Sequence, residues 1–290
     1  MTEWVCAMQF VILDLEWNGS YSRRRKKFIN EIIEFGAVKL SCDLHITETF
    51  SMLVNPQIGK KINDRIEALT HISNEELCKV DNTFTHALRK FRAFAKDCVL
   101  LTWGTSDILT LLDNYEYFLK QKKIDFAQQY VDLQHYCEQM LGRAEPSKLL
   151  GLSTAAQALS LNFEEEALHR ALADSMLAAR CFQKLYDKAK FESIIQNMDE
   201  EFYKRLTFKT TILSNIKNPL IDKSQMVMYC EGCGQAAKRK TPWIVKNKSF
   251  RAKFFCRNCN REYEARVRFK LKYDGVSVHK FMRVLKDAGE

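Results

Sequence analysis

Apolar residues in the first part of the chain follow the spacing of buried strands. The continuous apolar run at 8–15 (MQFVILDL) predicts a strand that is buried on both faces. Alternating patterns at 32–40 (IIEFGAVKL) and 46–54 (ITETFSMLV) predict two more strands, joined by a turn at 41–43. The run at 98–103 (CVLLTW) predicts a fourth strand.

Helical spacing of apolar residues follows these strands. Helices are predicted at 62–69, 83–96, 108–120, 152–159 and 168–187. A further helix is predicted to start at Ser73, which forms a capping box with Glu76. Residues 130–132 start a short strand or helix. Strands that form a meander and then alternate with helices indicate an α/β domain with a mixed sheet flanked by helices.

The pattern divides the chain into three parts. Residues 1–190 form the predicted α/β domain, 191–225 are predicted to be a helical linker, and 226–290 form a small strand-rich module. A chain of 290 residues is long enough for one large and one small domain.

Positive charge is concentrated in the last part of the chain. The formal net charge is +9, and the segment from Lys223 to the end has 17 Lys and Arg against 6 Asp and Glu. A basic module attached to a nearly neutral body favours a polyanionic partner, of which nucleic acid is the usual one. A solvated basic face with no partner is the alternative.

Scattered cysteines and the N-terminal segment bear on location. Six cysteines lie mostly inside apolar patterns, as buried reduced thiols do: Cys6, Cys42, Cys78, Cys98, Cys137 and Cys181. The first residues have no basic region before their apolar run, so no signal peptide is expected, and no stretch is long enough to span a membrane. We therefore expect a cytoplasmic protein with no membrane partner.

Asp14 and Glu16 form an acidic pair on the first predicted strand. Two residues apart, their side chains point to one face and are separated by about 6.6 Å along the backbone. Buried together they would repel, and a divalent cation such as Mg²⁺ or Mn²⁺ would relieve that repulsion. The alternative is a strand end with two solvated acids.

Three further polar residues interrupt apolar patterns. Asp107 follows Thr105 at a predicted helix start, where it is either a first-turn acid or a metal ligand. Asp174 lies in a helical pattern, although Asp is a poor helix former. If that helix begins just after His169, the histidine and Asp174 can reach a common site; otherwise His169 is a structural residue.

These residues occur in the order D-x-E, D, H-x-x-x-x-D, and the chain over about 8–187 thereby resembles the DEDDh branch of the 3′–5′ exonucleases. The segments EFGAV, LTHIS at 69–73 and YVDLQ at 130–134 are similar to the family as well. The overall likeness is greatest to exonucleases that trim histone-mRNA and small-RNA 3′ ends.

The resemblance implies an RNase H-like fold and a set of residue roles. Asp14, Glu16, Asp107 and Asp174 would bind two Mg²⁺ or Mn²⁺ ions, and His169 would be the general base. The products would be nucleoside 5′-monophosphates. The terminal nucleotide would contact residues around the acidic pair and the LTHIS segment, namely Leu15, Trp17, Leu69 and His71.

Four cysteines in the basic module are paired by their spacing. Cys230 and Cys233, then Cys256 and Cys259, form two C-x-x-C pairs separated by 22 residues, which predicts one structural Zn²⁺. Disulfides and a redox motif are the alternatives. The module resembles a zinc ribbon, and its few large apolar residues lead us to expect that it depends on metal to fold.

Three functional hypotheses follow. The first is a metal-dependent 3′–5′ exonuclease acting on RNA, tethered to nucleic acid by the zinc ribbon, in which Trp243, Phe250 and Phe254 either stack on bases or form the core. The second is a DNA exonuclease of proofreading or repair. The third is a catalytically silent nucleic-acid-binding protein. The oligomeric state is left open.

Overall fold

The computed structural model describes residues 8–142, 149–164 and 169–287 of the chain. They belong to two compact units, residues 1–206 and 207–290.

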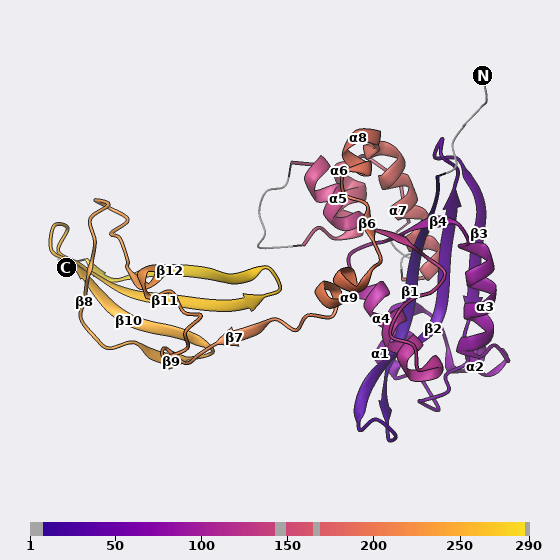
Figure 1. Ribbon diagram of the computed structural model, residues 1–290, viewed down its shortest axis with the longest axis horizontal. Helices are drawn as coiled ribbons and strands as arrows, with labels where there is room; N and C mark the ends of the chain where they lie inside the picture. Colours follow the sequence, from indigo (N-terminus) through magenta and orange to yellow (C-terminus); the bar gives the residue numbers. More distant parts are fainter. Residues whose placement is uncertain (1–7, 143–148, 165–168, 288–290) are drawn as a thin grey trace. The chain divides into compact units, whose positions relative to one another are not determined.

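A six-stranded mixed sheet forms the centre of the first unit (Figure 1). Its order is β3-β2-β1-β4-β5-β6, where β1 pairs in parallel with β4 and β4 with β5, while the other neighbours are antiparallel. The strands are β1 (Gln9–Ser22), β2 (Lys27–Leu40), β3 (Ile46–Leu53), β4 (Cys98–Thr102), β5 (Gln129–Asp132) and β6 (Gln196–Asn197). The predicted α/β fold with a mixed sheet is confirmed.

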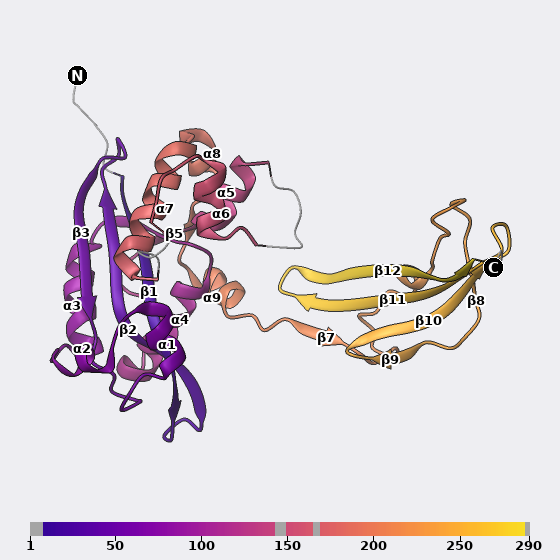
Figure 2. The same ribbon diagram turned by 180° about the vertical axis from the view of Figure 1, so that it is seen from behind.

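Helices cover both faces of this sheet (Figure 2). One core lies under α3 (Phe84–Phe94) and α4 (Ser106–Asn114), and the other under α5 (Leu133–Met140), α6 (Leu152–Ala158), α7 (Ala171–Leu185) and α8 (Lys188–Glu192). The remaining helices are α1 (Asp64–Thr70), α2 (Asn74–Cys78), the π-helical turn η1 (Tyr115–Leu119) and α9 (Glu200–Leu206). Alternate residues of β1 enter the two cores, so the strand is buried on both faces as its apolar run predicts.

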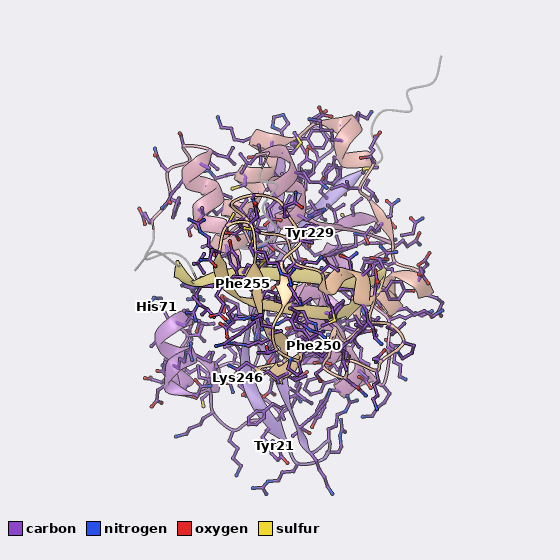
Figure 3. All side chains as sticks on the ribbon, turned by 90° about the vertical axis from the view of Figure 1, so that its left-hand side faces the viewer. Tyr21, His71, Tyr229, Lys246, Phe250 and Phe255 are labelled. Carbon is purple, nitrogen blue, oxygen red and sulfur yellow. The ribbon has the colours of Figure 1, made fainter. Side chains whose placement is uncertain are left out.

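The hairpin of β1 and β2 continues well beyond the strands that the apolar pattern predicts. The strands remain paired to Ser22 and Lys27, and Figure 3 shows Tyr21 toward the tip of this extension. Buried Glu31 stabilises it, because its carboxylate accepts the Ser20 hydroxyl at 2.7 Å and the backbone N–H of Gly59 at 2.9 Å. Hydrogen bonding and cross-strand pairs thus extend the strands where apolar alternation is absent.

The predicted linker at 191–225 is wrong. Its first part belongs to the first unit, where Phe191, Phe202 and Tyr203 are buried and the Tyr203 hydroxyl accepts the Ile124 N–H at 2.9 Å. Its second part belongs to the second unit, since Ile221 is buried in that unit's core. Two large aromatic side chains after position 200 could bury their surface only against the first unit, and this places its end at Leu206 rather than at 190.

An antiparallel sheet with a substantial core makes up the second unit. Its main order is β12-β11-β10-β8, with β7 beside β11 and β9 beside β10. The elements are β7 (Thr211–Leu213), the 3₁₀ turn η3 (Lys223–Met226), β8 (Lys238–Arg239), β9 (Ile244–Lys246), β10 (Ser249–Cys256), β11 (Arg261–Lys272) and β12 (Gly275–Asp287). Phe250, Phe254, Tyr263 and Phe269 are at most 3% exposed, so the unit buries more apolar surface than its sequence suggests.

The scattered cysteines differ from one another. Cys78, Cys98, Cys137 and Cys181 are free thiols, whereas Cys42 is disulfide-bonded, contrary to the expectation that all are reduced; Cys6 lies outside the described residues. Within the described ranges, no helix has the length and apolar character needed to cross a membrane.

Candidate active site and metal centre

Three carboxylates converge at the middle of β1. Asp14 and Glu16 lie two residues apart on that strand, and Asp174 reaches them from the first turn of α7. One oxygen from each of the three lies within 4.8 Å of the others, and all three side chains are half-buried. The shared face predicted for Asp14 and Glu16 is therefore present, with a third acid added from a distant part of the chain.

Gly36 allows α7 to approach the sheet closely enough for this. It lies opposite Asp14 on β2, and a Cβ built on it would lie 2.0 Å from the backbone carbon of Ala171. The Ser175 hydroxyl donates to the Gly36 carbonyl at 2.9 Å, which fixes the helix at this distance. Only glycine leaves room for backbone to approach backbone here.

Glu34 holds the start of the same helix. Its carboxylate is buried and accepts the backbone N–H of Ala171 at 3.0 Å, one of the N–H groups that a helix start leaves unpaired. The guanidinium of Arg170 forms an ion pair with Glu34 at 2.9 Å. Sequence reasoning missed both residues, although a glutamate between Ile33 and Phe35 in a buried strand pattern was a signal for a buried polar contact.

His169 lies just before α7, as the sequence argument requires. The helix begins at Ala171, and His169 is exposed in a left-handed conformation with φ of 65°. Its backbone N–H donates to the Asp174 carboxylate at 3.2 Å. This hydrogen bond fixes the turn that carries the imidazole next to one of the three clustered acids.

Asp107 lies beneath the cluster, in the first turn of α4. It is 4% exposed and accepts the backbone N–H of Leu15 at 3.0 Å. Pairing between β1 and β4 ends at Leu13 and Thr102, so the Leu15 N–H has no strand partner on that side and a side chain takes the place of one. Asp107 is not within 4.8 Å of all three clustered acids, but its charge acts on Asp14.

Burial and mutual repulsion raise the pKa of every acid at this site. For Asp14 burial is the main cause, followed by the charges of Asp107 and Asp174. Burial, and then the Asp174 charge, raises the pKa of Glu16 to about 8, and burial raises that of Asp107 to about 7 against the hydrogen bond from Leu15. Burial also raises the pKa of Asp174. Clustered acids of this kind favour a bound cation.

A divalent metal fits this donor set. The nearest cation, Arg170, is engaged by Glu34 and only slightly offsets the repulsion on Glu16. The carboxylate oxygens are hard ligands, suited to Mg²⁺ or Mn²⁺ rather than to soft metals. The cluster therefore has the charge, the ligand type and the spacing of a divalent cation site.

The predicted nucleotide contacts are placed less uniformly. The side chain of Leu15 is 2% exposed, because alternation along β1 turns it away from the Asp14 face and into the core, and a nucleotide contact of this residue stays a prediction. Trp17 packs partly against the same core. Leu69 is 44% exposed, and His71 ends α1 in an exposed left-handed conformation, so both remain predictions.

The four paired cysteines form a second cluster, in the second unit. One Sγ from each of Cys230, Cys233, Cys256 and Cys259 lies within 4.8 Å of the others, and all four are free thiols. The Sγ atoms of Cys233 and Cys256 are 3.5 Å apart, close to the separation of about 3.8 Å that tetrahedral Zn–S bonds of 2.3 Å require. The arrangement fits a zinc ion and excludes disulfides among these four.

Tyr263 supports this cluster and was not predicted from the sequence. Its hydroxyl lies 3.0 Å from the Cys230 Sγ, and this contact lowers the pKa of the Cys230 thiol to about 6. A lowered pKa favours the thiolate, which is the form that binds zinc.

Comparisons with known proteins agree with this geometry. The family model described as Exonuclease, of the RNase T type, matches residues 11–182. The chain is 29% identical over 183 residues to DNA polymerase III subunit epsilon of Aquifex aeolicus (strain VF5). The aligned region covers 63% of this chain and 83% of that protein. The chain belongs to the exonuclease family.

Solved structures share the fold. The nuclease domain of 3′hExo, a DEDDh family member bound to rAMP, superposes with a TM-score of 0.54 at 22% identity, covering 68% of this chain and all of that one. A 3′-exonuclease in a structure of histone mRNA stem-loop recognition gives the same TM-score and identity, over 65% of this chain and 84% of that one. The first unit of this chain has the RNase H-like fold of these exonucleases, and enzymes of this kind use divalent metals.

Proposed function

We propose that this enzyme removes nucleotides one at a time from the 3′ ends of RNA. Asp14, Glu16, Asp107 and Asp174 hold two Mg²⁺ or Mn²⁺ ions in this proposal, and His169 is the general base. The observation that carries it is the convergence of acids from β1 and α7 on one site, beside an exposed histidine.

The residues of the chain divide the chemical work. Bound divalent ions would polarise the scissile phosphate, activate water and stabilise the leaving 3′ oxygen. The carboxylates fix where the ions bind, and Asp174 also orients the turn that carries His169 through its backbone N–H. The exposed imidazole accepts a proton from the attacking water, and the product is a nucleoside 5′-monophosphate.

The second unit serves as a nucleic-acid-binding zinc ribbon in this proposal. Cys230, Cys233, Cys256 and Cys259 hold one structural Zn²⁺, supported by the tetrahedral-like spacing of their sulfur atoms. The excess of Lys and Arg in this part of the chain favours a polyanion, so the unit would raise the local concentration of substrate near the exonuclease.

A DNA 3′ end is the second candidate substrate. The 29% identity to a DNA polymerase III subunit supports it, whereas the histone-mRNA and rAMP structures among the structural neighbours support RNA. The catalytic residues are compatible with both, since the metal ions act on the phosphodiester that RNA and DNA share.

The test compares RNA and DNA oligomers of the same sequence, labelled at the 5′ end, with the full chain and Mn²⁺. We expect a ladder that shortens one nucleotide at a time, faster on RNA. Asp14→Asn should abolish the ladder while the protein still binds the oligomer. If DNA is degraded faster than RNA, a DNA 3′ end is the substrate in place of RNA. If the wild type hydrolyses neither strand, the proposed function is refuted.

A further inference from the structure

The two faces of the sheet in the second unit differ sharply in character. Along β11, Tyr263, Ala265, Val267 and Phe269 are buried in the core. The alternate residues therefore point to the opposite face, which no described element covers with a hydrophobic core. These outward residues are mainly basic: Arg266, Arg268, Lys270 and Lys272.

Neighbouring strands add to this basic face. The register places Arg251 of β10 beside Arg266, and Lys253 beside Glu264. The Glu264 carboxylate is already paired with Arg251 at 3.7 Å and with Arg283 at 3.4 Å. Its negative charge is thus neutralised locally, and the row along the rest of β11 keeps an excess of positive charge.

Two aromatic residues share the same face. Phe281 of β12 lies opposite Arg266 in the register, is 57% exposed, and has the Arg266 guanidinium 5.8 Å from its ring centre. Phe255 of β10 is half-buried, with the Lys240 ammonium 5.4 Å from its ring. Figure 3 labels Phe255 together with Phe250, which lies on the same strand but is 1% exposed in the core.

This distribution decides between the two roles that the sequence leaves open for three aromatic residues. Phe250 and Phe254 are core residues, and Trp243 packs partly against the same core. Phe281, on the basic side of the sheet, is 57% exposed and therefore available to stack. An exposed aromatic ring among arginines and lysines is the usual composition of a surface that binds unpaired bases and their phosphates.

We propose that this outer face, made of Lys253, Phe255, Arg266, Arg268, Lys270 and Phe281, binds single-stranded nucleic acid. The proposal rests on the proposed function, because the polyanion that the same chain hydrolyses is the partner to which this charge is complementary. Arg266, Arg268 and Lys270 are spaced at about 6.6 Å along β11 and contact phosphates. Phe281 stacks on a base, which requires the base to be unpaired.

The first test removes three phosphate contacts from the full chain. Arg266→Gln, Arg268→Gln and Lys270→Gln are combined in the Asp14→Asn background, and binding to a 5′-fluorescent 20-nucleotide oligouridylate is measured by anisotropy over a series of salt concentrations. The slope of the logarithm of the association constant against the logarithm of the salt concentration should become less steep by about 2. Each phosphate contact to a single strand contributes about 0.7 to this slope. Zinc content and thermal unfolding should match those of the parent protein.

The matched control removes three exposed lysines that do not belong to the outer face. Lys217→Gln, Lys223→Gln and Lys280→Gln change the net charge equally, and Lys280 lies opposite the buried Val267. An equal loss of slope in both triple variants would show that only net charge matters, and would overturn the proposed face. Unchanged binding in the outer-face triple would overturn it as well.

Phe281→Ala tests the single-strand preference. It should weaken binding of the oligouridylate about 5- to 100-fold and leave binding of a blunt duplex nearly unchanged. Equal losses on both would refute stacking. Hydrolysis of a dinucleotide, measured without the Asp14→Asn substitution, separates this proposal from the proposed function. The outer-face substitutions should leave the rate of this hydrolysis unchanged. If the wild type does not hydrolyse the dinucleotide, the proposed function fails at the catalytic site.

Discussion

Each unit of this chain gathers anionic ligands into one cluster, but the surroundings of the two clusters are different. The carboxylates of Asp14, Glu16 and Asp174 meet at a mixed sheet with a core on each face. Glu34 accepts a hydrogen bond from the first residue of α7, and Ser175 of α7 donates one to the sheet, so the helix is held in place. The packing of the protein thereby sets the positions of these three carboxylates. The repulsion among the acids is tolerated because the rest of the unit is stable enough to offset it.

The thiols are held by much less protein. Cys230 and Cys233 lie in a short loop closed by the isolated bridge of Tyr229 and Ala236. Cys256 is the last residue of β10, and Cys259 lies in the turn between β10 and β11. The sulfur atoms are oriented mainly by local contacts: the Tyr263 hydroxyl and backbone N–H groups of the two short loops. The comparison predicts that a metal at the first site would serve chemistry alone, whereas a metal at the second site would serve structure.

Removal of zinc should therefore have the largest effect. Zinc binding to comparable Cys-rich sites is worth about 10–16 kcal/mol, as much as the whole stability of a typical domain. A strong chelator, or Cys256→Ser, should abolish the unfolding transition of the second unit in calorimetry and leave that of the first unit unchanged. Cys78→Ser, at an exposed free thiol, is the control and should change neither. A second unit that stays folded without zinc would mean that its core suffices.

Loss of the imidazole should come next. His169→Ala should lower kcat by about 10²- to 10⁴-fold, because a positioned base contributes that much to proton transfer. Thermal stabilisation by Mn²⁺ should persist, since the carboxylates remain. His45→Ala, in the exposed turn before β3, is the control. A change in kcat of less than tenfold, or an equal effect of both variants, would exclude His169 as the base.

Gly36→Ala should disturb the carboxylate cluster through the backbone. The added Cβ would meet the Ala171 backbone, so α7 must retreat, and we expect a loss of about 1–3 kcal/mol of stability together with weaker Mn²⁺ stabilisation. Gly19→Ala is the matched control on the adjacent strand, where a Cβ meets nothing within 4 Å. Thermal unfolding with and without Mn²⁺ measures both effects. Equal stability of the two variants would show that the close approach of α7 is not required.

The local spacing of apolar residues predicted many of the strands and helices, because this spacing reflects which side chains are buried. The apolar run at 8–15 and the alternation at 32–40 are consequences of contact with two cores, so both strands were predictable. The acidic positions Asp14 and Asp174 were recognisable because each interrupts an apolar pattern. Their meeting in space was an expectation from family resemblance, since no local pattern states which helix lies on which strand.

Features that depend on distant contacts were not predictable in this way. The buried strand pattern around Glu34 signals a polar contact but does not say that its partner is the Ala171 N–H. The hairpin beyond Glu16 is held by hydrogen bonds that Glu31 accepts from another segment. The end of the first unit was placed too early because Phe202 and Tyr203 follow a polar stretch. In each case a single long-range contact decides the structure, and such contacts leave no periodic signal.

The last prediction concerns pH, and it applies to the first cluster only. The pKa of Glu16 is raised to about 8 and that of Asp107 to about 7, above their usual values near 4 in the unfolded chain. Between these values the folded metal-free protein binds more protons than the unfolded one, so its stability falls as pH rises from about 4 to about 8. The metal-bound protein has already lost these protons and lacks this dependence.

Stabilisation by Mn²⁺ should therefore increase with pH. The gain is about 1.4 kcal/mol per pH unit for each proton released on binding, and it should level off above about pH 8. Thermal unfolding at pH 6, 7 and 8, with and without Mn²⁺, measures it. Glu16→Gln should reduce the slope by removing one titrating group. If stabilisation by Mn²⁺ does not depend on pH over this range, the acids are already ionised before the metal binds. The fold of the first unit would then not force these carboxylates close enough together to raise their pKa values.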